Sequence, residues 1–341
     1  MRPDPALAST GTAAGLPRLP VRVQLGRADD LRAELVIEVG LPPDLAKAAT
    51  ELTLEATCSG PESVRSTTLP VQLPVSPGGR RKAAGGDLLQ GRVVLTEPAY
   101  WSPELPMLYR VGGRLLSAGQ PVAGLDEWVG LRRLGVRGRS VWLDGRRWVP
   151  RGLAGGRASG PDLADWLAAV EATTVAVVEL PAAVAADDRL PLWNCLAEAD
   201  RLGRPLFIRL AAGSPLATTA GVARLARHPA VLAAMLPAEL FAAAAEWKRV
   251  AGTMLLAAEV PGTQPPPAAL PGIDLLVVRL AADALPADIW RVPATLPAVV
   301  WQAAAAPSRA GCDRLQAALA SWRQAGEGPP ADWDWAGFLV G

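Results

Sequence analysis

The sequence has few residues of the kinds that carry metal, disulfide or histidine chemistry. Its 341 residues include one histidine, His228, and three cysteines, Cys58, Cys195 and Cys312. The cysteines are odd in number, far apart and outside any CxxC spacing, so neither a disulfide framework nor a zinc site is expected. We predict that the cysteines act as small buried apolar residues, and that the protein uses no metal and no other cofactor.

An excess of charge and a long apolar run are also missing. Lys plus Arg number 34 and Asp plus Glu number 33, so a net charge of +1 gives no basic field for nucleic acid or an anionic membrane. Pro237 and Glu239 interrupt the longest apolar stretch, 230–245, which is too short to span a membrane. With no signal peptide legible, we expect a cytoplasmic protein without nucleic-acid or membrane partners, in an oligomeric state that the sequence leaves open.

The sequence does contain enough apolar material for large cores. Half of the residues are hydrophobic and the mean hydropathy is +0.20, which is typical of a folded protein. Residues 1–16 are rich in Ala, Pro, Gly and Thr, so a flexible N-terminus is expected there. The remaining length is long for one small domain and predicts two domains or one large barrel.

Residues 17–138 show a hydrophobic pattern of period two. Short alternating segments such as 21–25, 34–39 and 52–57 are separated by clusters of Pro, Gly, Asp and Ser. Half-buried strands separated by turns at regular spacing are typical of antiparallel sandwiches. The pattern therefore predicts an Ig-like antiparallel β-sandwich.

Residues 139–341 change to short apolar strands that alternate with helical segments, which is typical of parallel βα units. Eight strands and five helices can be placed, and the proline-rich stretch 262–267 leaves no room for a normal helix after the fifth strand. This count predicts a compact (β/α)8 TIM barrel. The predicted strands are 147–152, 174–179, 205–210, 231–236, 253–259, 274–280, 297–302 and 337–340, and the predicted helices are 161–171, 190–202, 218–227, 241–250 and 307–324.

Several motifs near the junction of the two parts carry a family resemblance. Residues 100–109 read YWSPELPMLY, residues 130–132 read GLR, and residues 141–152 read VWLDGRRWVPRG. Together with Asp200-Arg201-Leu202-Gly203 and His228-Pro229-Ala230-Val231, they resemble glycoside hydrolase family 2, the β-galactosidase and β-glucuronidase family. The resemblance extends over 19–341 and implies the sandwich and the catalytic TIM barrel of that family, without its N-terminal sugar-binding domain.

The resemblance implies hydrolysis of O-glycosyl bonds in carbohydrate metabolism by two carboxylates about 5 Å apart. The spacing from His228 in the family motif places Glu239 at the acid/base position. Gln302 occupies the nucleophile position, and an amide does not form the glycosyl ester in the ordinary way. The family's active-site histidines have no counterpart, and His228 precedes a strand at the N-terminal end of the barrel, where a structural role is expected.

Charged and aromatic residues do occur where the C-terminal ends of the predicted strands would form the barrel mouth. They are Glu179, Arg209, Glu259, Arg279 and Trp301, which we take as candidate substrate-binding residues. One interpretation is a rebuilt site in which Glu239 works with Glu259 or Glu179. A second is an ion-pair cluster that fills an inactive site, and a third is a sugar site in which Trp301 stacks on a ring without cleavage.

The sequence leaves two functional hypotheses open. The first is a glycoside hydrolase of the family 2 type, weakened or inactive because of Gln302. The alternative is a non-catalytic carbohydrate-binding or scaffold protein, a pseudoenzyme. The first requires a second carboxylate about 5 Å from Glu239, whereas the second requires arginines in the mouth or a pocket without such a pair.

Overall fold

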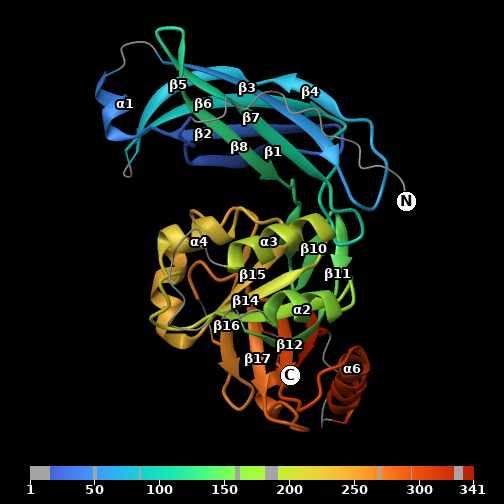
Figure 1. Cartoon of the computed structure of the whole chain (residues 1–341). Helices are drawn as coiled ribbons and strands as arrows, with labels where there is room; N and C mark the ends of the chain where they lie inside the picture. The colour runs from blue at the N-terminus through green and yellow to red at the C-terminus, as the bar shows by residue number, and fades with distance from the viewer. Residues whose placement is uncertain are drawn as a thin grey trace. The chain divides into compact units, whose positions relative to one another are not determined.

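The structure is a computed structural model that describes residues 16–48, 52–83, 86–157, 162–180, 191–267, 270–292, 294–325 and 333–341. The chain forms two compact units (Figure 1), one made of Met1–Ala99 and Met107–Leu131 and the other of Tyr100–Pro106 and Arg132–Gly341. The first unit thus ends at Leu131, whereas the sequence placed the boundary between the two domains after residue 138. In the described ranges no helix is long and apolar enough to cross a membrane.

The first unit consists of two four-stranded antiparallel sheets, as the period-two pattern predicted. On β2 the inward residues Ala33, Leu35, Ile37 and Val39 are fully buried, and they alternate with partly exposed residues over most of the strand. One sheet has the order β1 (Val21–Ala28), β2 (Arg32–Gly40), β6 (Gly86–Thr96) and β5 (Ser76–Ala83), and a short helix, α1 (Pro43–Ala48), follows β2. The other has the order β4 (Val71–Pro74), β3 (Leu52–Glu62), β7 (Leu108–Ser117) and β8 (Gln120–Val129).

The core of this unit is apolar and includes one thiol and one phenol. Cys58 on β3 is fully buried, and burial raises the pKa of its thiol to about 11. Tyr109 on β7 is 2% exposed, and its hydroxyl accepts a hydrogen bond of 2.9 Å from the Ala99 N–H. The prediction of an apolar role is confirmed for Cys58 and for Cys312, which is also fully buried, while Cys195 is half-buried.

The second unit contains the predicted closed barrel of eight parallel strands. A three-stranded antiparallel sheet, with the order β11 (Arg146–Trp148), β10 (Ser140–Leu143) and β9 (Leu134–Arg137), precedes it. The barrel then closes when β19 pairs with β12 in parallel. Its strands are, in order, β12 (Arg151–Arg157), β13 (Val175–Leu180), β14 (Leu206–Leu210), β15 (Val231–Leu236), β16 (Leu255–Pro261), β17 (Leu275–Leu280), β18 (Ala298–Gln302) and β19 (Gly337–Val340).

The predicted barrel strands agree closely with these bounds except at the first one. Residues 146–148 belong to β11, so the barrel begins later, at Arg151, because the β10–β11 hairpin uses the preceding residues. In the described ranges no helix lies between β16 and β17, as the prolines predicted. The helical elements are α2 (Asp162–Ala169), α3 (Pro191–Leu202), α4 (Thr219–Leu225), η1 (Ala238–Ala243), α5 (Ala244–Trp247), η2 (Asp288–Arg291) and α6 (Arg309–Gln324).

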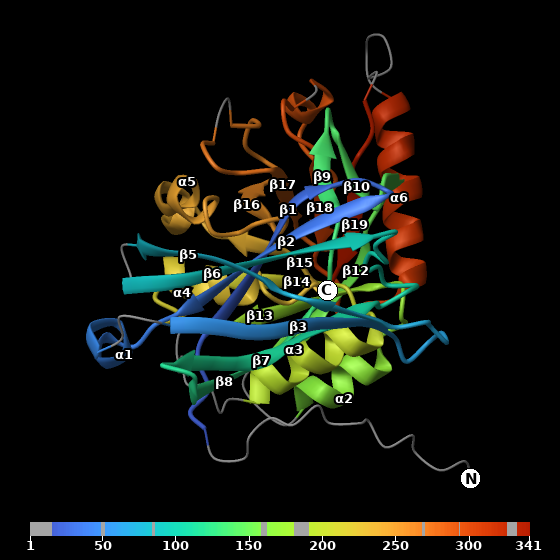
Figure 2. The same ribbon diagram turned by 90° about the horizontal axis from the view of Figure 1, so that it is seen from above.

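Helix α6 shows how the surrounding helices cover the barrel. Ser308 caps its first turn by accepting a hydrogen bond of 3.1 Å from the Gly311 N–H. Its apolar stripe, which includes Leu315 and Leu319, is buried, and the helix packs along β12 and β19 (Figure 2). The parallel pairing of the strands sets their register, and the helix covers the outer side of two of them.

Candidate functional site at the barrel mouth

Parallel pairing brings the candidate residues of neighbouring strands to the same level of the barrel. Glu179 on β13 lies opposite Arg209 on β14, and Arg279 on β17 lies opposite Trp301 on β18. All of these positions are at or next to the C-terminal end of their strands, where barrel loops form active sites. The charged side chains that the sequence assigned to this end of the barrel do lie on neighbouring strands there.

Arg209 connects two of the carboxylates. Its Nη1 donates to Glu179 Oε1 at 2.5 Å, and its Nε donates to Glu259 Oε1 on β16 at 2.7 Å. The Glu259 side chain is 8% exposed and that of Glu179 is 39% exposed. Burial lowers the pKa of Arg209, but the hydrogen bonds and charges of Glu259 and Glu179 outweigh it, so the pKa lies above its usual value.

A second guanidinium covers the tryptophan. The Arg279 Cζ lies 3.4 Å from the centre of the Trp301 ring, and the indole Nε1 donates to the Gly341 carbonyl at 2.8 Å. Burial, reinforced by the charge of Arg209, holds the pKa of Arg279 below its usual value against the attraction of Glu259 and Glu179. Among the described residues, the buried Nη1 of Arg279 has no hydrogen-bond partner.

Gln302 and Glu239, the two positions identified from the family motifs, lie in different surroundings from this cluster. Gln302 ends β18, next to Trp301, and its side-chain Nε2 donates to the Ala284 carbonyl at 2.9 Å. Glu239 follows β15 in the first turn of η1 and is exposed. It is not among the residues that line the opening at the mouth, so the structure brings Glu179, Arg209, Arg279 and Trp301 together without it.

The opening has a volume of about 330 Å³, the size of a small ligand site. Its charged lining consists of Glu179, Arg209 and Arg279, and its apolar lining includes Ala154 and Val177. In the ranges that the structure describes, no three His, Cys, Asp or Glu side chains gather closely enough to hold a metal ion. The lining can offer hydrogen-bond donors and acceptors to a polar ligand but no metal chemistry from such a group.

Solved structures share this architecture. No protein-family model matches the sequence, and no curated protein matches it in sequence. Bacteroides uniformis β-glucuronidase aligns over 94% of this chain and 45% of its own, with 15% identity and a TM-score of 0.56. A glycosyl hydrolase family 2 member from Bacteroides cellulosilyticus aligns over 95% of this chain and 44% of its own, with 13% identity and a TM-score of 0.57. Ruminococcus gnavus β-glucuronidase aligns over 94% of this chain and 60% of its own, with 12% identity and a TM-score of 0.56.

The chain has the fold of the family 2 glycoside hydrolases. It spans less than half the length of the two Bacteroides proteins. At these identities the likeness concerns the fold, and the roles of the mouth residues depend on their own geometry.

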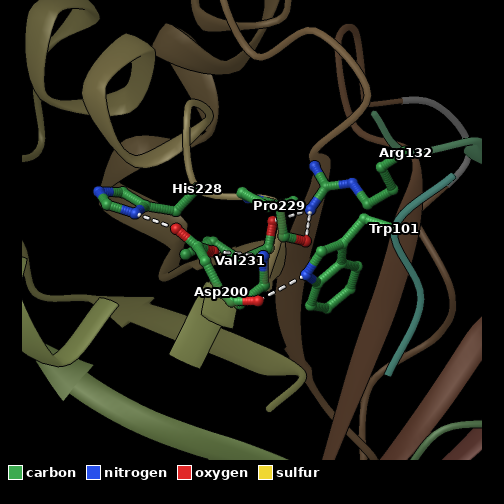
Figure 3. Close-up of polar contacts among 7 residues, drawn as sticks. Trp101, Arg132, Asp200, His228, Pro229 and Val231 are labelled. Atoms are coloured by element: carbon green, nitrogen blue, oxygen red, sulfur yellow. Dashed lines mark hydrogen bonds and ion pairs between the residues drawn. The ribbon is translucent and has the colours of Figure 1, made fainter. Parts of the chain in front are cut away.

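Four of the five motifs that carried the family 2 resemblance meet at the opposite, N-terminal end of the barrel (Figure 3). The Trp101 indole Nε1 donates to the Asp200 backbone carbonyl at 2.8 Å, and the Trp101 side chain is fully buried. The Asp200 carboxylate is 2.6 Å from His228 Nδ1 and accepts a hydrogen bond of 2.8 Å from the Ala230 N–H. This arrangement confirms the structural role expected for His228.

Arg132, from the GLR motif, extends the same network. It is 3% exposed and donates through Nη1 to the carbonyls of Pro229 and Val231, the latter at 2.7 Å, and through Nε to Thr253 Oγ1 at 3.2 Å. Burial lowers the pKa of Arg132 to about 10. The motifs could be recognised in the sequence, but their convergence on one network could not be predicted, because their members are far apart along the chain.

Proposed function

We propose that this protein binds a saccharide at the barrel mouth and does not cleave it by the double displacement of family 2 glycosidases. The observation that carries the proposal is the single guanidinium of Arg209, which engages both Glu179 and Glu259 at the mouth of a glycosidase-type barrel. It thereby occupies both of the carboxylates that could have replaced the missing nucleophile.

The chemistry of double displacement requires one carboxyl that donates a proton and a second that attacks the sugar. Glu179 and Glu259 both accept hydrogen bonds from Arg209, and neither is placed as a proton donor. Gln302 carries an amide at the position of the nucleophile, and an amide is a poor nucleophile. Glu239 is exposed and lies outside the lining of the opening.

The lining favours a polar, hydroxyl-rich ligand. A carboxylate, two guanidiniums and the apolar Ala154 and Val177 match the hydroxyl edges and C–H faces of a sugar. The saccharide class also agrees with the fold, because solved proteins of this architecture include β-glucuronidases. Arg279 covers one face of Trp301, so the ligand contacts the mouth mainly through hydrogen bonds rather than through stacking on that face.

A second candidate function is hydrolysis by a rebuilt pair of glutamates. One observation favours it: Glu179 and Glu259 reach the same guanidinium and therefore lie near each other at the mouth. In that case one of them would have to release Arg209 and hold a proton during turnover.

An activity and binding experiment separates the two candidates. We expect no hydrolysis of aryl β-galactoside, glucuronide, mannoside or glucoside above the rate of the Glu179→Gln, Glu259→Gln and Glu239→Gln variants. We expect calorimetry to detect binding of at least one of the corresponding free sugars, with affinity about tenfold weaker in Glu179→Gln. Glu198→Gln, which changes an exposed glutamate paired with an arginine on α3, is the matched control. Turnover that disappears in Glu179→Gln or Glu259→Gln would establish the hydrolase instead, and absence of both binding and turnover would contradict both candidates.

Restoring the family nucleophile gives a further prediction. Gln302→Glu is expected to stay inactive on the same aryl glycosides, because Glu239 lies outside the opening and Arg209 engages both Glu179 and Glu259. Release of the aryl alcohol is the measurement. If Gln302→Glu gained turnover that Gln302→Glu combined with Glu239→Gln lost, Glu239 would be a competent acid despite its place outside the opening.

A further inference from the structure

A hollow of the first unit lies on the β4-β3-β7-β8 sheet, in the unit that does not contain the barrel. It has a volume of about 540 Å³. Gly112 on β7 contributes no side chain to it, and a Cβ at this position would meet no atom closer than 4.0 Å. The residues directly opposite it, Thr57 on β3 and Asp126 on β8, do carry side chains, so the absence of one at Gly112 leaves a depression between them.

Two ion pairs frame this hollow. The Arg110 guanidinium binds Asp126 with two hydrogen bonds, Nε to Oδ1 at 2.7 Å and Nη2 to Oδ2 at 3.2 Å. Arg114 donates through Nε to Glu55 Oε2 at 2.8 Å. The charges of these four lining residues cancel, and the bidentate geometry holds Arg110 and Asp126 in a fixed orientation. Arg18, whose Nη2 lies 3.7 Å from Asp126 Oδ2, adds an exposed cation beside them, so the four lining residues offer oriented donors and acceptors with no net charge of their own.

Uncharged polar side chains complete the lining. Thr57 and Ser59 on β3 and Gln72 on β4 all border the hollow. Among the described residues, none of these three side chains has a hydrogen-bond partner, and none is sealed from solvent. Hydroxyl and amide groups without a partner in the protein bind water. Replacing that water with the hydroxyls of a ligand costs little free energy.

An exposed aromatic ring lies at one edge of the same face. Trp128 on β8 is directly opposite Arg110 in the β7–β8 pairing and is 43% exposed. The Arg110 Cζ is 5.9 Å from the Trp128 ring centre. A large ring left exposed beside a polar hollow offers a flat apolar surface that the C–H face of a sugar ring can cover.

We propose that this hollow, defined by Gly112, the Arg110–Asp126 and Arg114–Glu55 pairs, Thr57, Ser59 and Gln72, binds a neutral oligosaccharide with one sugar ring over Trp128. The volume is of the size that ordinary small-molecule sites have. Balanced charges favour a neutral ligand over an anionic one, and the combination of hydroxyl partners with an aromatic ledge favours a sugar over an apolar molecule. The site is separate from the barrel mouth and does not depend on the function proposed for it.

A side chain at Gly112 tests the proposal with little risk to folding. Gly112→Val fills the hollow at a position with room for a Cβ. Gly79→Val is the matched control, because Gly79 on β5 of the other sheet also has no atom within 4 Å of an added Cβ. Both variants are compared with the unaltered chain by thermal unfolding and then by calorimetry against neutral gluco-, xylo-, manno- and galacto-oligosaccharides. Trp128→Ala and the mouth variant Glu179→Gln are measured in parallel.

We expect at least one of these oligosaccharides to bind, with affinity lowered about tenfold or more in Gly112→Val and in Trp128→Ala. Binding is expected to be unchanged in Gly79→Val, and any part of the binding that Glu179→Gln loses is assigned to the barrel mouth. The proposal is overturned if no oligosaccharide of the panel binds, or if Gly112→Val binds as tightly as the unaltered chain. Loss of binding in Glu179→Gln alone would place the sugar at the barrel mouth, which would support the mouth function and reject this site.

Discussion

Asp200→Ala is expected to lower the free energy of unfolding of the second unit by about 3 kcal/mol. The carboxylate is the hydrogen-bond acceptor for the buried Ala230 N–H and the partner of His228 Nδ1, and alanine leaves both without it. The site is too enclosed for water to replace these bonds freely, since the Asp200 side chain is 10% exposed and that of His228 is 18% exposed. Urea unfolding followed by tryptophan fluorescence measures the change.

Asp200→Asn is the control that separates the hydrogen bonds from the charge. The amide oxygen can accept from Ala230 and the amide nitrogen can donate to His228, so a loss of about 1 kcal/mol or less is expected near neutral pH. If Asp200→Asn destabilised the unit as strongly as Asp200→Ala, the negative charge rather than hydrogen bonding would hold the network together.

The difference in stability between Asp200→Asn and the unaltered chain should depend on pH in a defined direction. Burial raises the native pKa of Asp200, although His228, the Ala230 N–H and Arg132 act in the opposite direction. A carboxyl with a raised native pKa contributes stability that is complete below its unfolded pKa of about 3.9 and is lost as the pH rises through the native value. Asparagine has no such contribution. The stability of Asp200→Asn relative to the unaltered chain should therefore increase from about pH 4 upward, and a decrease would contradict the assignment.

Gly203→Ala is expected to have an effect of similar size, about 3 kcal/mol. Gly203 follows the last residue of α3 with φ of +67°, a conformation that costs alanine about 1 kcal/mol. An added Cβ would also lie 2.5 Å from the Pro103 carbonyl oxygen, so backbone would have to move. Because Pro103 belongs to the segment that contains Trp101, the shift should disturb the indole bond to Asp200 as well.

Gly252→Ala isolates the conformational part of this prediction. Gly252 has φ of +56° and no atom within 4 Å of an added Cβ. It should therefore lose only about 1 kcal/mol in the same unfolding experiment. Equal losses in the two variants would show that the contact between the added Cβ and the Pro103 carbonyl costs no stability beyond the backbone conformation.

The distribution of family 2 motifs over the barrel has a simple physical interpretation. Trp101, Arg132, Asp200 and His228 belong to motifs that resemble those of that family, and they lie in one buried network at the N-terminal end of the barrel. Residues at that end of a TIM barrel support stability, whereas chemistry belongs to the C-terminal end. At the C-terminal end, Gln302 and the residues around Glu239 are positions where the sequence predicted a departure from the family pattern. The chain thus has a buried network of motif residues at one end of the barrel and the charged groups Glu179, Arg209 and Arg279 at the other.

Much of the architecture could be predicted from local pattern. The strands at 231–236 and 337–340 were predicted with their observed bounds, because continuous apolar runs between turn residues leave little choice. The first barrel strand was misplaced because residues 146–148 are equally compatible with a hairpin and with a barrel strand. The pairing of β11 with β10 decided between them, and such pairing is a property of two segments rather than one.

At the mouth, the sequence identified the charged residues but not their partners. The predicted strand order placed Glu179, Arg209 and Arg279 at one end of the barrel, since residues at the C-terminal ends of parallel strands surround a common space. Only the tertiary structure decided that Arg209 would engage Glu179 and Glu259 together, that Arg279 would lie on Trp301, and that Glu239 would stay outside the opening. Hydrophobic periodicity determines elements and their faces, whereas ion pairing depends on strand register and side-chain reach across the barrel, which are settled when the strands close.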